Sequence, residues 1–150
     1  MKNVYRITAA LTVTMLLTSC GTKKNIDVVD MAAVLSESIT FSEQLTEFDS
    51  AGAENYLMLN PNDYNEMSVY ISTKACGDEL AVIKTDSPKS VANKLTDHVN
   101  NLMEEYAVFR PTETGKIENA VINTYKDTVV FMIAPDMDDA QAAYKEYLKN

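Results

Sequence analysis

Two short segments, ELAVIKT at residues 79–85 and TVVFMIA at residues 128–134, decide the fold of this chain. Both have the length of a β-strand and are rich in branched apolar residues. Neither shows the alternation of apolar and polar residues that is typical of a strand with one solvent-exposed face. Each segment therefore predicts a strand that is buried on both faces. Because soluble domains rarely expose a large apolar patch, other elements are expected to cover both sides of the sheet.

The segment before each buried strand is predicted to be its antiparallel partner. Residues 67–73 precede the first strand across a loop at residues 74–78. Residues 117–125 precede the second strand across a tight turn at Lys126 and Asp127. The chain is therefore expected to contribute four strands in two hairpins.

A helix is predicted after each hairpin. The first begins at Pro88, behind Ser87 as its N-cap, and ends before Pro111. The second covers residues 136–148, with Asp136 as its cap. The sequence thus predicts two consecutive strand–strand–helix (ββα) units.

Two more helices and a turn are predicted before the first hairpin. A short helix is expected at residues 50–57, and residues 60–63 (NPND) mark a turn. The N-terminal helix starts behind Asp27 and has an apolar face made of Val28, Met31, Ala32, Leu35 and Ile39.

These elements predict an α+β fold. The compact arrangement is a four-stranded, mainly antiparallel sheet built from the two ββα units, with both of their helices on one face. The N-terminal helix, together with Phe41, Leu45 and Phe48, is expected to cover the other face.

The first twenty residues are typical of an export signal. Residues 1–6 carry Lys2 and Arg6 without an acid, and the apolar run at residues 7–17 is shorter than the ~20 residues that a membrane-spanning helix needs. Leu17, Thr18, Ser19 and Cys20 follow, and this sequence resembles the bacterial lipobox. The resemblance implies cleavage between Ser19 and Cys20 and a diacylglyceryl group on the Cys20 sulfur. The alternative is an ordinary signal peptide whose cysteine falls at the boundary by chance.

The lipobox divides the chain into three parts. Residues 1–19 would be the signal peptide, residues 20–26 the lipidated N-terminus and a short tether, and residues 27–150 a single α+β domain. The predicted location is the outer face of the cell membrane. Five extended residues span at most ~18 Å, so the domain is expected to stay close to the bilayer.

The net charge excludes one class of partner. The chain carries a formal charge of −9, and removal of residues 1–19 leaves 11 basic residues against 22 acidic ones. Nucleic acid would be repelled by this field, so it is excluded as a partner. No phosphate-binding glycine loop or zinc-ligand spacing is present in the sequence, so no cofactor is predicted.

Three places in the domain offer reactive side chains. Cys76 and His98 are the thiol and the imidazole that a nucleophilic enzyme would need, although nothing in their spacing brings them together. The alternative is an incidental loop cysteine and a histidine on the flank of a helix. Asp136, Asp138 and Asp139 form the densest acidic cluster, which is either a metal site or a helix cap with favourable acids in the first turn.

Parts of the strand pattern resemble a known family. Residues 69–72 (VYIS), 77–84 (GDELAVIK) and 116–122 (KIENAVI) are similar to a family of small lipoproteins of clostridia and their relatives, known as domain of unknown function number four-three-five-eight. The resemblance extends roughly over residues 28–148. It implies an extracytoplasmic lipoprotein of a Gram-positive cell and carries no catalytic residues.

The function class that follows is a non-catalytic one. We expect a membrane-anchored binding or accessory module whose partners are the membrane, through the lipid on Cys20, and another envelope protein or peptide. The alternative is a small envelope hydrolase or metal-dependent enzyme that uses Cys76 with His98, or the acidic cluster at Asp136.

Overall fold

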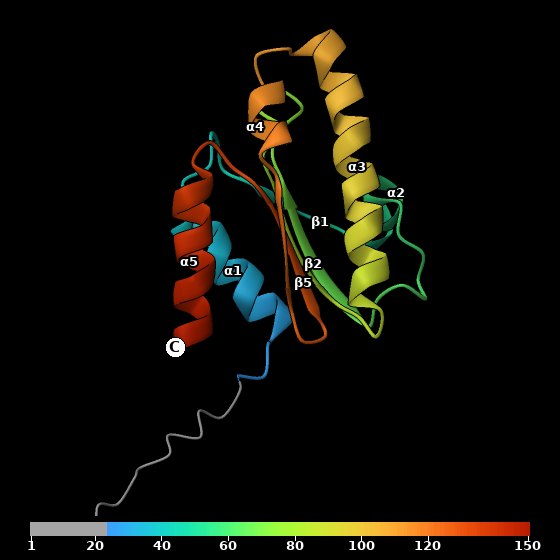
Figure 1. The fold of residues 1–150 in the computed structure, drawn as a ribbon, viewed down its shortest axis with the longest axis vertical. Helices are drawn as coiled ribbons and strands as arrows, with labels where there is room; N and C mark the ends of the chain where they lie inside the picture. The colour runs from blue at the N-terminus through green and yellow to red at the C-terminus, as the bar shows by residue number, and fades with distance from the viewer. Residues whose placement is uncertain (1–23) are drawn as a thin grey trace, which may run out of the picture.

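The computed structural model describes residues 24–150, so the predicted signal peptide, Ser19 and Cys20 lie outside the described residues. The described chain has an α+β fold of five helices and a five-stranded antiparallel sheet (Figure 1). No helix within these residues is long and apolar enough to cross a membrane. The helices are α1 (Val28–Ser38), α2 (Ser50–Leu57), α3 (Pro88–Phe109), α4 (Thr114–Glu118) and α5 (Met137–Lys149). The strands are β1 (Thr46–Phe48), β2 (Glu66–Ile71), β3 (Glu79–Lys84), β4 (Val121–Tyr125) and β5 (Thr128–Ile133).

The two apolar segments form the centre of the sheet. Strand order is β1-β2-β3-β5-β4, and β3 pairs with β5 so that Ala81 lies opposite Phe131. Successive side chains point to opposite faces of a strand, and both faces of β3 and β5 are buried as predicted. One face, which we call the α1 face, presents Leu80, Val82, Val130 and Met132. The other, the α3 face, presents Ala81, Ile83, Val129, Phe131 and Ile133.

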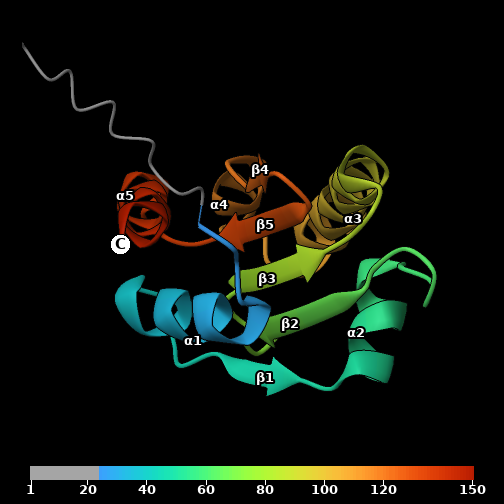
Figure 2. The same ribbon diagram turned by 90° about the horizontal axis from the view of Figure 1, so that it is seen from below.

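The placement of the helices differs from the prediction. Helices α1 and α5 share the α1 face, whereas α2 and α3 lie on the α3 face (Figure 2). Helix α4 contributes Ile117 to the core on the α3 face. The expectation that the two ββα helices share one face was therefore wrong. Helix α1 has only 11 residues, and α5 completes the cover beside it, where the Tyr147 hydroxyl donates a hydrogen bond to Asp30 Oδ2 at 2.7 Å.

The predicted count of four strands was also wrong. Strand β1 adds a fifth at the edge, where Glu47 lies opposite Tyr70 of β2. Only 3 residues long, it carries no periodic pattern that the sequence could reveal. The edge strand is set by its pairing with β2 rather than by its own composition.

The strand predicted at residues 117–125 begins only at Val121. The residues before it form α4, which buries Ile117 completely against the α3 face. Lys116 of this helix pairs with the buried carboxylate of Asp78 in the β2–β3 loop. This long-range contact favours the helical turn over an extended strand.

The helix starts follow the predicted capping residues. The carboxylates of Asp27 and Asp136 accept backbone N–H groups at the starts of α1 and α5. Ser87 occupies the N-cap position of α3, but its hydroxyl caps no N–H group. Instead, its own N–H donates to Thr85 Oγ1 at 3.0 Å.

The turn at residues 60–63 yields a prediction about acid stability. Asp63 Oδ2 accepts hydrogen bonds from Lys94 Nζ and from the Asn60 N–H, both at 2.6 Å, and these bonds lower the pKa of Asp63. A carboxylate with a lowered folded-state pKa stabilises the protein above its unfolded pKa, and this contribution is lost as pH falls through the folded value. We expect Asp63→Asn to lower the free energy of unfolding by about 1 kcal/mol near neutral pH and by much less near pH 2.

Urea unfolding between about pH 7 and pH 2 measures this difference. Lys94→Met removes the same ion pair and should reduce the acid dependence as well. A constant difference between Asp63→Asn and the parent protein over the whole range would contradict the assignment.

Candidate functional site

His98 lies inside the core rather than on the flank of its helix. It is 3% exposed and belongs to the buried stripe of α3. Its Nε2 atom lies 2.8 Å from Oε2 of Glu79, the first residue of β3. The imidazole also packs edge-on against the rings of Tyr56 and Phe131, at centroid distances of 4.9 and 5.9 Å. His98 is thus a packed core residue with a carboxylate partner.

Tyr56 completes the bonding of that carboxylate. Its hydroxyl, from α2, donates to Glu79 Oε1 at 2.5 Å, so both oxygens of the 2%-exposed Glu79 are engaged. Burial raises the pKa of Tyr56 above its usual range, and the charge on Glu79 adds to the effect. Tyr56 therefore stays a hydrogen-bond donor. The three side chains form a closed network within the core, which we call the Tyr56–Glu79–His98 network.

Cys76 is not brought to His98 by the fold. It lies half-buried in the β2–β3 loop, and no hydrogen bond or ion pair joins the two side chains. Partial burial raises the pKa of the Cys76 thiol, and the nearby carboxylates of Glu43 and Asp78 raise it further. Because the thiolate is the nucleophilic form, this environment makes Cys76 a weak nucleophile near neutral pH.

The acidic cluster at the start of α5 acts as a helix cap. Asp136 Oδ1 accepts the N–H groups of Asp138 and Asp139, each at 3.0 Å. Asp139 Oδ2 accepts the Thr40 N–H at 3.5 Å, which links α5 to the end of α1. Within residues 24–150, no three His, Cys, Asp or Glu side chains converge as ligands of a metal ion.

A buried ion pair, which the sequence reasoning missed, holds the β2–β3 loop in place. Asp78 is fully buried, and its Oδ1 atom pairs with Nζ of Lys116. Lys116 also reaches Glu113 Oε2 at 2.7 Å and Ser42 Oγ at 3.2 Å, while Asp78 Oδ2 accepts the Ser42 N–H at 2.5 Å. Burial opposes the charge on Lys116, but hydrogen bonds to Asp78 and Glu113 outweigh it and raise the pKa of the ammonium group.

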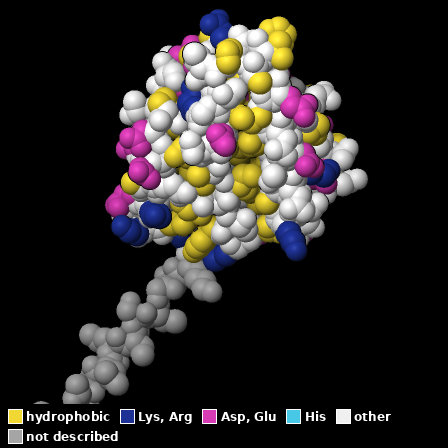
Figure 3. Space-filling model, turned by 45° about the horizontal axis from the view of Figure 1, so that its top comes forward, with side chains coloured by type: hydrophobic (Ala, Val, Ile, Leu, Met, Phe, Trp, Pro, Cys, Tyr) yellow, Lys and Arg dark blue, Asp and Glu magenta, His cyan; other side chains and the backbone are white. Residues whose placement is uncertain are grey.

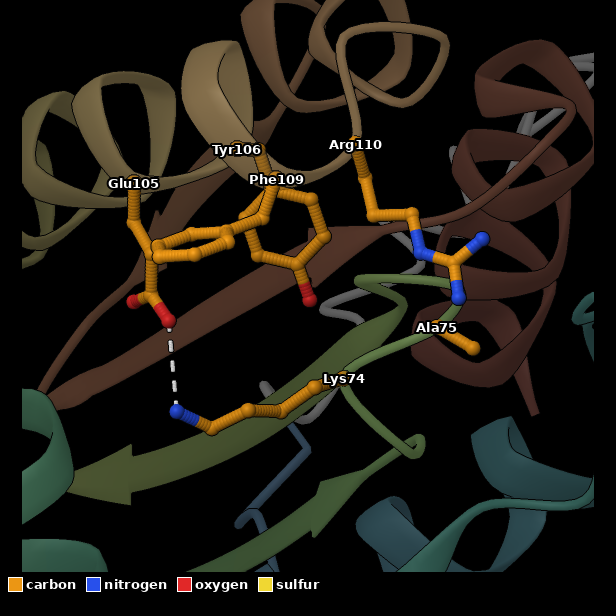
Figure 4. A pocket seen from close by; sticks show the side chains of 6 residues that line it. All are labelled: Lys74, Ala75, Glu105, Tyr106, Phe109 and Arg110. Atoms are coloured by element: carbon orange, nitrogen blue, oxygen red, sulfur yellow. Dashed lines mark hydrogen bonds and ion pairs between the residues drawn. The ribbon is translucent and has the colours of Figure 1, made fainter.

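A pocket opens next to this loop, at the end of α3. It has a volume of about 440 Å³, within the range of small-ligand sites. Tyr106, Phe109 and Arg110 reach down from α3 toward the β2–β3 loop (Figure 4). We call it the tip pocket, and its lining residues are Lys74, Ala75, Glu105, Tyr106, Phe109 and Arg110.

Two polar groups of the tip pocket have no partner among the described residues. The Arg110 guanidinium makes no hydrogen bond or ion pair there, and neither does the hydroxyl of Tyr106. Burial, followed by the charge on Glu79, raises the pKa of Tyr106 to about 12, so its hydroxyl stays a donor. Lys74 pairs with Glu105 at 3.2 Å across the mouth of the pocket. Both free polar groups can thus donate a hydrogen bond.

Gly77 of the β2–β3 loop packs closely against the Tyr106 ring. Gly77 has φ +66°, and a Cβ atom at this position would lie 3.1 Å from the ring. The loop therefore needs glycine here for its backbone conformation and for the close approach of the ring. Tyr106 is 5% exposed, and its packing in the core positions the hydroxyl in the pocket.

Two exposed apolar side chains end α3, and one of them, Phe109, lines the pocket. Val108 and Phe109 are 75% and 74% exposed, the most exposed large hydrophobic side chains of residues 24–150. Figure 3, which brings the upper end of the molecule toward the reader, shows hydrophobic side chains beside basic ones there. The end of α3 therefore places the charge of Arg110 next to apolar surface, with Glu104 and Glu105 one turn earlier.

The sequence contained a weak signal for this site. Arg110 is the only arginine after Arg6, and it follows the apolar Val108 and Phe109 directly before a proline. Lys74 and Ala75 lie more than 30 residues earlier, and only the hairpin brings them to the end of α3. Glu79 had a signal too, as an acid at the start of a strand that is otherwise apolar on both faces.

Comparison with known proteins gave a family match that includes the tip pocket. No curated protein and no solved structure gave a significant match. Residues 37–134 match the family described as Domain of unknown function (DUF4358), a narrower range than the predicted residues 28–148. The match includes the tip pocket and the Tyr56–Glu79–His98 network, and it leaves out α5 and most of α1. This chain belongs to the DUF4358 family.

Proposed function

We propose that this protein is a lipid-anchored, extracytoplasmic binding module that engages another envelope protein or peptide through the tip pocket. The observation that carries the proposal is a pair of donors, Arg110 and Tyr106, that no described residue pairs, in a pocket rimmed by the exposed Phe109. Unpaired charge next to exposed apolar surface is typical of binding sites. The alternative, an envelope enzyme, gains no support from the positions of Cys76, His98 and Asp136.

The orientation of the domain supports the choice of a protein or peptide partner. Lys24, the first described residue, lies on the Tyr147 ring of α5, with Nζ 3.6 Å from the ring centroid. This end of the molecule lies opposite the end of α3 (Figure 1). The 22 residues of α3 span about 33 Å. A domain tethered through Cys20 would therefore present the tip pocket away from the bilayer, toward other envelope components.

Photo-cross-linking in the native cell tests whether the tip pocket binds an envelope protein. A photoreactive amino acid at position 109 is expected to give a discrete adduct with one envelope protein, because this side chain is 74% exposed at the pocket rim. The same probe at position 29, which is 54% exposed on α1, is the matched control and should not give that adduct. Equal adducts from both positions, or none from position 109, would contradict binding at the tip pocket.

Substitution of each cysteine tests the lipid anchor, with Cys20→Ala as the test variant and Cys76→Ala as its control. Cys20→Ala is expected to abolish lipid labelling, to move the protein out of the membrane fraction or leave it unprocessed, and to remove the adduct from position 109. Cys76→Ala should change none of these results, since Cys76 lies in the β2–β3 loop outside the lining of the tip pocket. Unchanged lipid labelling and fractionation of Cys20→Ala would overturn the anchor.

A further inference from the structure

The free polar groups of the tip pocket share one property: each can donate a hydrogen bond. The Arg110 guanidinium and the Tyr106 hydroxyl point from α3 toward the β2–β3 loop, and Lys74 lies across the pocket from them (Figure 4). Glu105, the only acid of the lining, is already paired with Lys74. The guanidinium can only donate and the hydroxyl can donate as well, so a ligand that satisfies both groups at once brings acceptors. An ionised carboxylate consists only of acceptors, and it matches the fork of a guanidinium.

The walls of the pocket are partly apolar, so a ligand that fills it is expected to carry an apolar group next to its acceptors. Phe109, Ala75 and the ring of Tyr106 line the pocket together with the donors. A volume of about 440 Å³ accommodates one or two amino-acid residues. Inorganic anions would leave the aromatic walls in contact with water, so they fit the pocket less well.

We propose that the tip pocket binds a carboxylate attached to an apolar or aromatic residue, as at the free C-terminus of a peptide. This inference deepens the proposed function, because it names the ligand chemistry of the same pocket. Arg110 receives the carboxylate, Tyr106 donates to its second oxygen or to the adjoining carbonyl group, and the ring of Phe109 covers the apolar side chain. Among the lining side chains, Lys74, Arg110 and Glu105 sum to one positive charge, while the carboxylates of Glu79 and Glu113 act on Tyr106 from outside the lining.

A second hollow of the described surface offers no such match. This hollow, of about 630 Å³, borders Lys116 and Asp136. Lys116 is already bound by two carboxylates, and Asp136 caps α5. The unpaired donors therefore favour the tip pocket over this larger hollow.

A titration of the full-length protein in detergent micelles, followed by NMR, tests the proposal. The probes are the peptide acetyl-Ala-Ala-Phe with a free C-terminus, the same peptide with a C-terminal amide, and 3-phenylpropionate. We expect the free-acid peptide to bind at least about tenfold more tightly than the amide, because a charge-assisted hydrogen bond is lost with the carboxylate. Competition by 3-phenylpropionate at similar concentration identifies a small carboxylate as sufficient, whereas weak competition identifies the peptide terminus as the source.

Variants of the pocket provide the controls. Arg110→Ala is expected to weaken binding of the free acid about tenfold or more, and Tyr106→Phe several-fold, since it removes only the hydroxyl. Lys89→Ala removes one positive charge at the far end of α3 and should leave binding unchanged. Equal affinities for acid and amide, an equal effect of Lys89→Ala and Arg110→Ala, or no binding at about 1 mM would overturn the proposal.

Failure of this proposal and failure of the proposed function give different results. A cross-link from position 109 with no preference for carboxylate probes leaves a binding module of other ligand chemistry. Carboxylate binding without lipid on Cys20 and without a cross-linked partner leaves a small-molecule site instead.

Discussion

Replacing Lys116 by methionine is expected to lower the free energy of unfolding by about 3–5 kcal/mol, because it strands a buried charge. The Asp78 side chain is fully inaccessible to solvent, and Lys116 Nζ is the cation paired with its Oδ1 atom. Methionine keeps most of the volume of the lysine stem, so the effect reports the lost charge rather than a cavity. Urea unfolding followed by circular dichroism measures the change.

Two further variants separate the buried pair from general charge effects. Lys149→Met removes a lysine that is paired with Glu146 but 72% exposed, and it should change stability by less than about 0.5 kcal/mol. Asp78→Asn combined with Lys116→Met removes the stranded charge and should recover a large part of the loss. If Lys116→Met is no more destabilising than Lys149→Met, the pair does not hold the loop.

The second large effect is expected at the core histidine. His98→Leu should destabilise the protein by about 3 kcal/mol, because the buried Glu79 Oε2 loses its partner. Leucine fills a similar volume, so the loss reflects an unsatisfied buried carboxylate. Thermal and urea unfolding of the variant check this value.

Removal of the whole network gives the decisive comparison. The triple variant Tyr56→Phe, Glu79→Met and His98→Leu replaces every polar member by an apolar side chain of similar shape. Such replacements are often neutral or stabilising, so the triple variant should be clearly more stable than His98→Leu alone. A triple variant that loses as much stability as the summed single variants would show that packing, and not the stranded carboxylate, causes the effect.

Both predictions concern contacts that no local pattern could reveal. His98 and Glu79 are 19 residues apart, and Lys116 and Asp78 are 38 residues apart and lie on different elements. The sequence offered His98 only as a histidine on the flank of a helix, whereas the partner that allows its burial lies on β3. Periodicity describes one element at a time, whereas the burial of a polar group depends on what another element supplies.

The candidate site residues that the sequence suggested also differ from those that the structure brings together. The sequence led to Cys76, His98 and Asp136 because they carry reactive or ligating side chains. The structure places His98 in the core and uses Asp136 as a cap. The tip pocket instead depends on Tyr106 and Arg110, whose hydroxyl and guanidinium find no hydrogen-bond partner among residues 24–150.

The sequence by itself determined the elements that local forces control. Capping residues and apolar periodicity placed the starts of α1 and α5, and the doubly apolar segments placed β3 and β5 at the centre of a sheet covered on both sides. These features depend on short-range hydrogen bonds and on the burial of contiguous residues.

Only the tertiary structure decided how those elements are distributed. It added β1, made residues 114–118 a helix, and put α3 and α5 on opposite faces. The physical reason is that both faces of β3 and β5 are apolar, so the pattern requires cover on each side without assigning a helix to either. The assignment, and with it the tip pocket, follows from how well the helices pack together.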